Sequence, residues 1–212
     1  LSLNKAKICY INQGISNKSF PYKIRSTERF RKVLYYGRLD PSKNIHLLPS
    51  LLLELNRSGD IYTIDIFGRP ANLESEKYFL NVRSSDQVKI QGSSINFHGS
   101  IERALVSNVA ENYDVFLNLF SGSLDKTLVE ATFMGMPVVT WNLEYCSQFG
   151  TWSNFPVSET IDFIIKEFEA IDSMKNSELQ EEIARRLNLA IKSHSFEGWI
   201  DRLVRVLRGG KF

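Results

Sequence analysis

The sequence predicts an α/β protein with a Rossmann-like, doubly wound parallel sheet, helices on both faces of that sheet, and further helices appended at the C-terminus. Two observations lead to this fold class. Short runs of β-branched and aromatic residues alternate with longer segments of helical period along most of the chain. The short runs are apolar nearly throughout, as strands are when helices cover both faces of a sheet. Such alternation builds right-handed βαβ units, whose ligands bind at the carboxyl ends of the strands.

Six runs have the composition of buried parallel strands, and four segments between them carry the periodic apolar residues of helices. After residue 152 the strand-like runs stop, and three amphipathic helical patterns follow. The expected strands are residues 7–11, 32–37, 62–68, 87–90, 114–120 and 137–141, and the expected helices are residues 45–55, 74–83, 101–112, 124–134, 158–171, 177–191 and 196–207.

Composition excludes several classes of protein. The chain has 212 residues, of which 43% are hydrophobic and 24% charged, with a formal net charge of +2. This composition suits a substantial core, and so small a net charge gives no reason to expect a nucleic acid partner. Cys9 and Cys146 are isolated, which disfavours a disulfide framework or a zinc site and favours a reducing compartment. No run approaches the ~18 apolar residues of a membrane span, and no signal segment is present, so we expect a cytoplasmic protein.

The segment SGSLDKTLVEATFMGMPVV, residues 121–139, places small residues between the end of one expected strand and the start of a helix. Free backbone N–H groups at a helix start attract anions, and Ser123, Lys126 and Thr127 add further donors. Glu130 lies one turn after Lys126, where its carboxylate suits a ribose diol. The alternative is an ordinary N-capped helix with a solvated Lys126–Glu130 pair.

Two further loops at expected strand ends carry cations. GRLDPSKN, residues 37–44, presents Arg38 and Lys43, and FGRP, residues 67–70, presents Arg69 after Gly68. A planar guanidinium beside a point-charged ammonium suits a diphosphate better than a single carboxylate. The alternative is a pair of basic surface loops. Neither loop is a Walker A sequence, and no GxGxxG follows the first strand, which disfavours ATP hydrolysis and dinucleotide redox chemistry.

Taken in order, these motifs resemble the C-terminal, donor-binding half of retaining GT-B glycosyltransferases of the family 4 type. The resemblance rests on INQGISNKSF (11–20), GRLDPSKN (37–44), NFHG (96–99) and DVFLNLFSGSLDKTLVEATFMGMPVV (114–139), and it covers nearly the whole chain. It implies one half of a GT-B fold. Residues 1–30 would then be an incoming strand and linker from a missing N-terminal domain, and residues 31–212 the donor-binding domain with its C-terminal helices. The start at Leu1 rather than Met fits a segment of a longer protein.

The resemblance also implies roles for individual residues. Arg38 and Lys43 would contact the donor diphosphate and stabilise it as a leaving group, and Glu130 would bind the ribose hydroxyls. The donor would be a nucleoside-diphosphate sugar of the UDP or GDP type, with no separate cofactor. No metal site is expected, because no DxD pair stands at a strand end. The full set of expected donor-binding residues is Gly37, Arg38, Lys43, Gly68, Arg69, His98, Ser123, Leu124, Asp125, Lys126, Thr127 and Glu130.

Two positions qualify the resemblance. Many members of the family carry a first glutamate eight residues before the second, and Gly122 stands at that position here. The contacts to the sugar ring are therefore in question, with Asp125 or Lys126 as substitutes, whereas those to the nucleotide are not. His98 follows a strand and would lie near the nucleobase, although a strand-end histidine is also commonly a hydrogen-bonded surface residue.

The function that follows is a metal-independent, retaining glycosyltransferase of the hexosyltransferase type in polysaccharide biosynthesis, with a saccharide or lipid-linked acceptor. Because the acceptor side belongs to the missing domain, this chain alone would be inactive, and that domain would also make any peripheral contact with the inner face of the membrane. The alternative is a module that binds a nucleotide or sugar phosphate without catalysis. A phosphorylated regulator is disfavoured, because KICYINQG, residues 7–14, has no aspartate at the first strand end.

Overall fold

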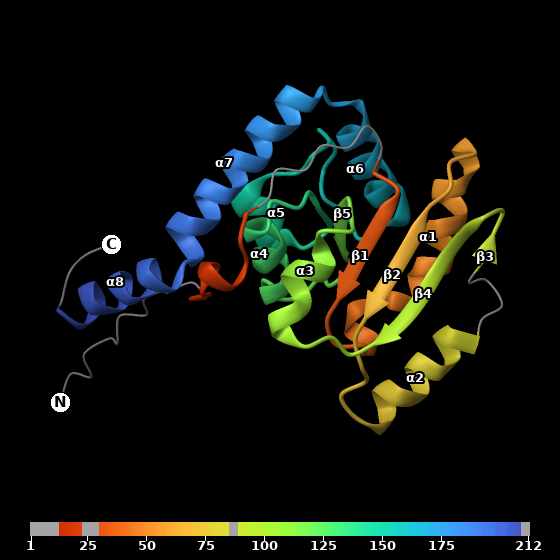
Figure 1. Cartoon of the computed structure of the whole chain (residues 1–212), viewed down its shortest axis with the longest axis horizontal. Coiled ribbons are helices and arrows are strands. Elements are labelled where there is room, and N and C mark those ends of the chain that lie inside the picture. Colours follow the sequence, from red (N-terminus) through yellow and green to blue (C-terminus); the bar gives the residue numbers. More distant parts are fainter. Residues whose placement is uncertain (1–12, 23–29, 85–88, 209–212) are drawn as a thin grey trace, which may run out of the picture.

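The computed structural model describes residues 13–22, 30–84 and 89–208 (Figure 1). The expected strand at residues 7–11, with Cys9, and the first two residues of the expected strand at 87–90 lie outside these described residues.

A six-stranded sheet in the order β3-β4-β2-β1-β5-β6 forms the centre of the described chain. Five of its strands run parallel, and β3 pairs antiparallel with β4 at one edge. The predicted doubly wound parallel sheet is therefore confirmed. The strands are β1 (Lys32–Tyr36), β2 (Thr63–Phe67), β3 (Lys89–Ile90), β4 (Ser93–Gly99), β5 (Val115–Asn118) and β6 (Val138–Thr140).

The strand order places a switch point between β1 and β5. From β1 the chain moves outward to β2 and β4, and it then returns to pair β5 with the other side of β1, with Val33 opposite Val115. Consecutive crossovers therefore leave in opposite directions on the two sides of this point. In open parallel sheets a crevice forms there, beyond the carboxyl ends of the strands.

Alternate residues of the strands feed two separate cores. Val33 and Tyr35 of β1 point into one core, and Leu34 and Tyr36 point into the other, with all four side chains buried. This period of two, with both faces apolar, is why the strand reads as a continuous apolar run. Helices α1 (Leu48–Leu55), α2 (Leu73–Ser84) and α6 (Ile161–Ser173) supply the first core, and α3 (Val106–Ala110), α4 (Lys126–Phe133) and α5 (Leu143–Phe149) supply the second.

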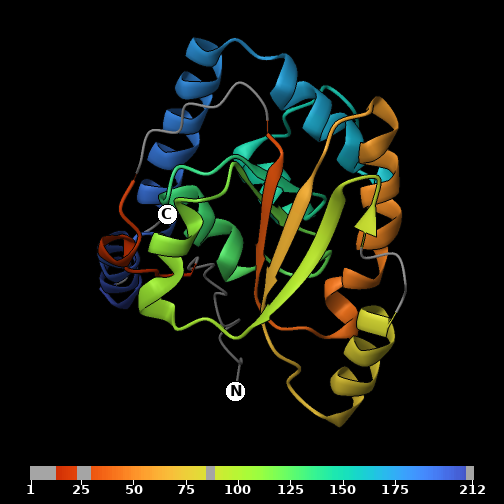
Figure 2. The ribbon, with the colours of Figure 1, turned by 45° about the vertical axis from the view of Figure 1, so that its right-hand side comes forward.

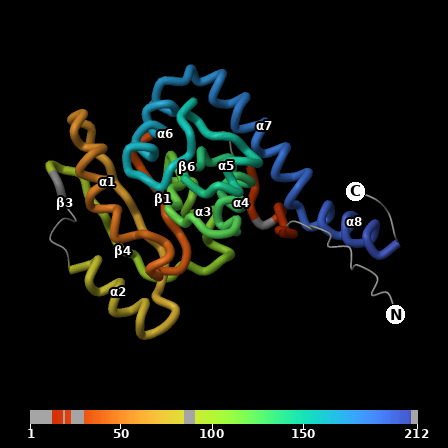
Figure 3. The backbone as a smooth tube through the Cα atoms, turned by 180° about the vertical axis from the view of Figure 1, so that it is seen from behind, coloured from red at the N-terminus to blue at the C-terminus, as the bar shows by residue number. Residues whose placement is uncertain are grey.

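Figure 2 shows the sheet lying between the orange α1 on one side and the green α3 and α4 on the other. Helix α7 (Asn176–His194) spans both layers, because Leu179 and Ile183 pack in the first core and Ala190 packs in the second. Helix α8 (Phe196–Leu207) continues from α7 away from the sheet, as Figures 1 and 3 show. Within the described part of the chain, no helix is long and apolar enough to cross a bilayer.

The expected buried strand at residues 87–90 is wrong in kind. Its described part, β3, is an antiparallel edge strand, and the parallel strand is β4, of which only the end, NFHG (96–99), was located from the sequence. Between them Gln91 and Gly92 both have positive φ, as in a tight type I′ hairpin turn. On β4 polar Ser94, Asn96 and His98 alternate with apolar residues, because one of its faces is not buried. A search for continuously apolar runs therefore passes over this strand.

Other elements differ in extent. The expected helix at residues 101–112 is only η6 (Arg103–Leu105) followed by the short α3, which leaves residues 100–102 in an extended loop after β4. Helix α5 was not predicted. The three C-terminal helices are confirmed within three residues at each end. The remaining short helices are η1 (Asn17–Ser19), η2 (Pro41–Lys43), η3 (Ile45–Leu47) and η4 (Asn56–Ser58).

Candidate functional site

A cavity of about 290 Å³ lies beyond the carboxyl ends of β1, β2 and β4, beside the first turns of α4. It occupies the place at which the strand order predicts a ligand crevice. Its polar and charged groups come from four separate segments, which only the fold brings together. The lining residues are Tyr36, Gly37, Arg38, Phe67, Gly68, Arg69, Ser100, Ile101, Arg103, Val106, Thr127 and Glu130.

Two glycines let the strand-end loops approach each other closely. Gly37 has a φ of 152°, a conformation that residues with a side chain rarely adopt. A Cβ atom at Gly68 would collide with the carbonyl oxygen of Gly37. The backbone then continues the ladder past the strands, with Gly37 N donating to Phe67 O at 3.0 Å and Gly68 N to Gly99 O at 2.7 Å. These turns leave the exposed side chains of Arg38 and Arg69 at the mouth of the cavity.

Glu130 is the one carboxylate in the described lining of this cavity, and it is only 4% exposed. The hydroxyl of Tyr36 donates to its Oε2 at 3.3 Å, and Nη2 of Arg103 lies 2.7 Å from its Oε1. Burial raises the pKa of Glu130, and the positive charge of Arg103 opposes that rise. Oε1 is buried and, apart from this ion pair, accepts no aligned hydrogen bond in the described chain.

The alternative interpretation of Glu130, a solvated pair with Lys126, does not describe the structure. Lys126 is exposed at the first position of α4, whereas the carboxylate of Glu130 is buried and forms its ion pair with Arg103 of another segment. A carboxylate buried beside a cavity has lost most of its hydration, and such a group requires a partner or a ligand.

Lys43 is placed differently from the prediction. Its ammonium lies 2.5 Å from Oδ2 of Asp125 and 3.6 Å from the centre of the Phe120 ring, and the residue is only 6% exposed. The alternative of a basic surface loop therefore does not describe Lys43, and the described lining of the cavity does not include it either. Of the two cations expected to hold a diphosphate, only Arg38 faces the cavity.

Asp125 joins this pair to the start of α4. Its carboxylate caps the helix by accepting from the backbone N–H of Thr127 at 3.1 Å and from the hydroxyl of Thr127 at 3.0 Å. Burial acts to raise the pKa of Asp125, but the hydrogen bond and charge of Lys43, with the donors of Thr127, outweigh burial and lower it. The start of α4 is polar as predicted, but its polar side chains bond to one another.

Gly122, at the position of the family's first glutamate, lies beneath an aromatic ring. A Cβ atom there would collide with the ring of Phe120, the same ring that stacks on Lys43. A glutamate at this position would therefore require Phe120 to move. In this chain the Phe120 ring and the Lys43–Asp125 ion pair lie near residue 122.

The other expected residues divide into two groups. Thr127 lines the cavity with the two glycines, Arg38, Arg69 and Glu130. His98 stacks on Phe67 with ring centres 4.7 Å apart and bonds Asp65 through Nε2 at 2.9 Å, and the described lining does not include it. The described lining also leaves out Ser123, Leu124, Asp125 and Lys126.

The sequence analysis missed Arg103, the partner of Glu130. NFHG (96–99) was taken as a strand end, but residues 101–112 read as one helix, which hid the loop between β4 and η6. Recognition of β4 by its alternating pattern would have placed residues 100–103 at the same sheet edge as the two basic loops. Tyr36 was predicted to be a buried strand residue. It belongs to the second core and also lines the cavity.

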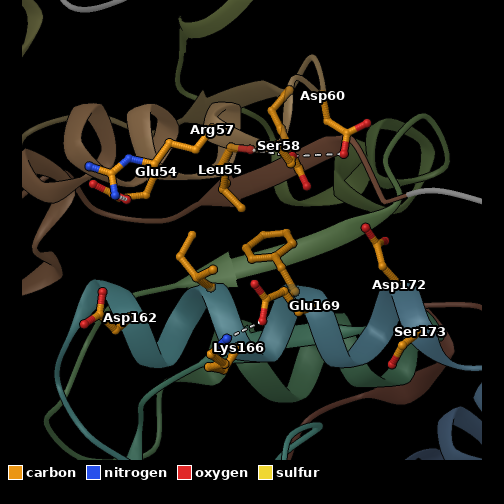
Figure 4. Close-up of a pocket in the computed structure, with 13 residues that line it drawn as sticks. Glu54, Leu55, Arg57, Ser58, Asp60, Asp162, Lys166, Glu169, Asp172 and Ser173 are labelled. Atoms are coloured by element: carbon orange, nitrogen blue, oxygen red, sulfur yellow. Dashed lines mark hydrogen bonds and ion pairs between the residues drawn. The ribbon is translucent and has the colours of Figure 1, made fainter.

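A second, larger cavity of about 680 Å³ lies between α6 and the segment formed by α1 and η4 (Figure 4). Its two basic side chains are both paired with carboxylates of the same lining. Arg57 pairs with Glu54 at 2.7 Å, and Lys166 pairs with Glu169 at 2.6 Å. Tyr62, which precedes β2, lines it, so it lies at the amino ends of the strands, away from the strand-end loops. The smaller cavity is therefore the better candidate for a functional site.

The described residues contain no group of three His, Cys, Asp or Glu side chains that could hold a metal ion.

Comparison with known proteins gives a likeness of structure and not of sequence. No family model matches the chain, and none of the curated proteins compared with it matches either. HepE from Anabaena, solved with UDP and glucose, has a TM-score of 0.73 at 14% identity over 93% of this chain. Sucrose-phosphate synthase from Thermosynechococcus elongatus has a TM-score of 0.71 at 14% identity over 94%. A TarM variant from S. aureus, solved with UDP and alpha-GlcNAc-glycerol among its ligands, has a TM-score of 0.62 at 15% identity over 88%.

The chain spans 56%, 51% and 38% of these three proteins, respectively. At such low identity the likeness concerns the fold, and it confirms the predicted fold: this chain has the Rossmann-like architecture of one half of a GT-B fold.

The Lys43–Asp125 pair yields a stability prediction. Lys43→Met leaves a buried carboxylate without its cation, so we expect the free energy of unfolding to fall by about 3 kcal/mol in urea denaturation. Lys126→Met, which removes an exposed lysine from the same helix start, should change it by less than about 0.5 kcal/mol. Equal effects of the two variants would show that the pair does not stabilise the fold.

The same pair makes stability depend on pH. Because the pKa of Asp125 is lower in the folded chain, its contribution is present above the unfolded pKa and is lost as the pH falls through the folded value. Unfolding free energy should therefore decline as the pH drops below ~4, and less steeply in Asp125→Asn.

Proposed function

We propose that this chain is the donor-binding half of a retaining, metal-independent glycosyltransferase, which transfers a sugar from a nucleoside-diphosphate sugar of the UDP or GDP type to a saccharide or lipid-linked acceptor. One observation carries the proposal. The cavity at the switch point combines Arg38, Arg69 and Arg103 at its mouth with the buried carboxylate of Glu130. Cations for an anion, beside an acceptor for hydroxyl groups, are the complement of a nucleoside diphosphate.

The arginines suit the chemistry of the leaving group. Departure of a nucleoside diphosphate from an anomeric carbon builds negative charge on the diphosphate, and fixed cations stabilise that charge in the transition state. Arg38 and Arg69 stand on neighbouring strand-end loops held together by backbone hydrogen bonds. In the proposed reaction these groups supply the positive charge that a metal supplies in other enzymes.

Glu130 suits the ribose. Its Oε1 is buried, lies beside the cavity and accepts no aligned hydrogen bond in the described chain. A carboxylate accepts hydrogen bonds from two neighbouring hydroxyl groups, which a ribose presents and a 2′-deoxyribose does not.

The proposed catalytic site is completed by a second domain. Transfer requires donor and acceptor to be held together in a water-poor cleft, and that alignment accounts for roughly 7–11 kcal/mol of barrier lowering. The chain spans only 38–56% of the neighbouring structures, which supports an acceptor side outside it. The polysaccharide-biosynthetic and cytoplasmic setting belongs to the same proposal.

The second candidate, a module that binds a nucleotide or sugar phosphate without catalysis, is favoured by Lys43. Its ammonium is committed to Asp125, which leaves one fewer cation for a leaving group than the resemblance implies. Binding experiments test what the two candidates share, and turnover separates them.

The first test is nucleotide binding by calorimetry. We expect UDP or GDP to bind the chain with an affinity unchanged by EDTA. Arg38→Ala should weaken binding by about 1.5 kcal/mol, because the lost contact is charge-assisted but the side chain is well exposed. Arg57→Ala, far from the cavity, is the matched control. No binding of UDP, GDP or ADP would refute the nucleotide site.

The second test concerns the ribose. The wild-type chain should prefer UDP to 2′-deoxy-UDP by roughly tenfold or more, because the buried carboxylate is left partly unpaired by the deoxy analogue. Glu130→Gln should reduce this preference, while Glu169→Gln on the exposed face of α6 leaves it intact. Equal affinities of the wild-type chain for the two nucleotides would contradict the assignment of Glu130.

The third test is turnover. Incubated with UDP-sugars and a panel of saccharide and lipid acceptors, the chain should bind the donor without transferring it, whereas a longer protein that includes its upstream reading frame should transfer it. Transfer by the 212-residue chain at the rate of the longer protein would place the acceptor site within these residues. Binding without transfer by both proteins would favour the second candidate.

A further inference from the structure

Arg103 and Glu130 form an asymmetric pair across the cavity. Arg103 begins η6, four residues after the end of β4, and Glu130 lies in the middle of α4. The two side chains meet with Nη2 2.7 Å from Oε1. The carboxylate side chain is 5% exposed, whereas the guanidinium side chain is 57% exposed. The anion is therefore buried at the wall, and the cation covers it from the mouth.

A buried carboxylate needs such a partner if it is to stay ionised. Burial raises the pKa of Glu130, and the groups facing it in the described chain are Arg103 of η6, the hydroxyl of Tyr36 on β1, and Lys126 one turn earlier on α4. Arg38 and Arg69 line the same cavity. Of these charged groups, only Arg103 forms an ion pair with Glu130 in the described chain. Ionisation matters because a protonated carboxyl accepts hydrogen bonds poorly.

The guanidinium of Arg103 is also held from a second direction. Its central carbon lies 5.3 Å from the centre of the Phe20 ring, and Phe20 is 1% exposed in the second core. A cation held against a buried aromatic face has a restricted position. The contact with Oε1 is an ion pair and not an aligned hydrogen bond, so this buried oxygen has unused acceptor capacity beneath the guanidinium.

We propose that Arg103 is a positioning residue for Glu130: it fixes the carboxylate at the cavity wall and keeps it charged, so that Glu130 can accept both hydroxyl groups of a vicinal diol. The diol is the ribose of the proposed nucleotide, so this part rests on the proposed function. The pairing of Arg103 with Glu130 does not rest on the proposed function, and it is tested without ligand.

Two rival roles predict different results. If the Arg103 side chain instead blocked the place of the ribose, its removal would tighten nucleotide binding. A direct phosphate contact would weaken ribose and deoxyribose nucleotides equally at every pH. A positioning residue affects the ribose preference itself, through the protonation state of Glu130.

The first experiment measures the pKa of Glu130 in the empty protein, from the carboxyl ¹³C resonance assigned by its loss in Glu130→Gln. We expect Arg103→Met to raise that pKa by about one unit or more, since a neighbouring opposite charge shifts a carboxyl by 1–3 units. Arg103→Lys, which keeps the charge, should restore most of the original value. It also serves if the methionine variant fails to fold.

The matched control is Arg57→Met. Arg57 pairs with Glu54 at the same 2.7 Å, but 29% of the Glu54 side chain is exposed and it lines the other cavity. Its removal should leave the Glu130 pKa unchanged. A Glu130 pKa that does not respond to Arg103→Met overturns the proposal.

The second experiment compares UDP and 2′-deoxy-UDP from pH 5 to pH 8. In the wild-type chain the ratio of the two affinities should stay nearly constant over this range. In Arg103→Met it should fall toward one at the acidic end, where Glu130 is protonated, and recover as the pH rises. Tighter binding, or equal weakening of both nucleotides at every pH, overturns the proposal. If the wild-type chain binds neither nucleotide, the proposed function fails, and the ligand-free measurement still decides the role of Arg103.

Discussion

The candidate site depends on one constraint of parallel sheets: every strand must deliver its carboxyl end to the same edge. Residues 37–38, 67–69, 100–103 and 127–130 are far apart in the sequence, and they meet because β1, β2, β4 and β5 run in one direction. The reversal of strand order between β1 and β5 then opens space at that edge. Gly37 and Gly68 keep the space narrow enough to act as a site, because their lack of side chains lets the two loops bond each other.

The basic residues near this edge divide into two kinds according to burial. Lys43 is buried against Asp125 and Phe120, where removal of either charge leaves the other uncompensated, so its main effect is on stability. Arg38 and Arg69 are well exposed, so their charges are available to a ligand, whose own charge would be partly desolvated on binding. Arg103 is exposed too, but its charge is paired with the buried carboxylate of Glu130. Motif spacing alone does not separate these two kinds, because burial depends on packing against Phe120, which is 77 positions from Lys43 in sequence.

Whether each strand could be predicted from the sequence depended on how many of its faces are buried. Strands β1, β2, β5 and β6 lie in the interior of the sheet or against its helices, so their apolar runs were recognisable. Strand β4 alternates polar and apolar residues, because Ser94, Asn96 and His98 face a side of the sheet that is not buried. Only its end, NFHG (96–99), was recognised. Residues 101–112 were assigned to one helix, so Arg103 was not placed at the sheet edge. The prediction for Glu130 needed only the spacing within α4, whereas its partner depended on a contact between distant segments.

The departure at Gly122 separates the two halves of the proposed donor. The groups suited to the nucleotide come from strand ends and the first turns of α4, whose positions the sheet dictates, and this framework is shared with structures only 14–15% identical in sequence. The groups near the helix start, at residues 120–125, are set by side-chain packing instead. Here Phe120 covers Gly122 and stacks on Lys43, so an aromatic face and a closed ion pair stand near the position where a free carboxylate is expected. Under the proposed function, the backbone would hold the nucleotide while a few side chains set the contacts next to it, and the sugar is the part of the donor on which such changes would act.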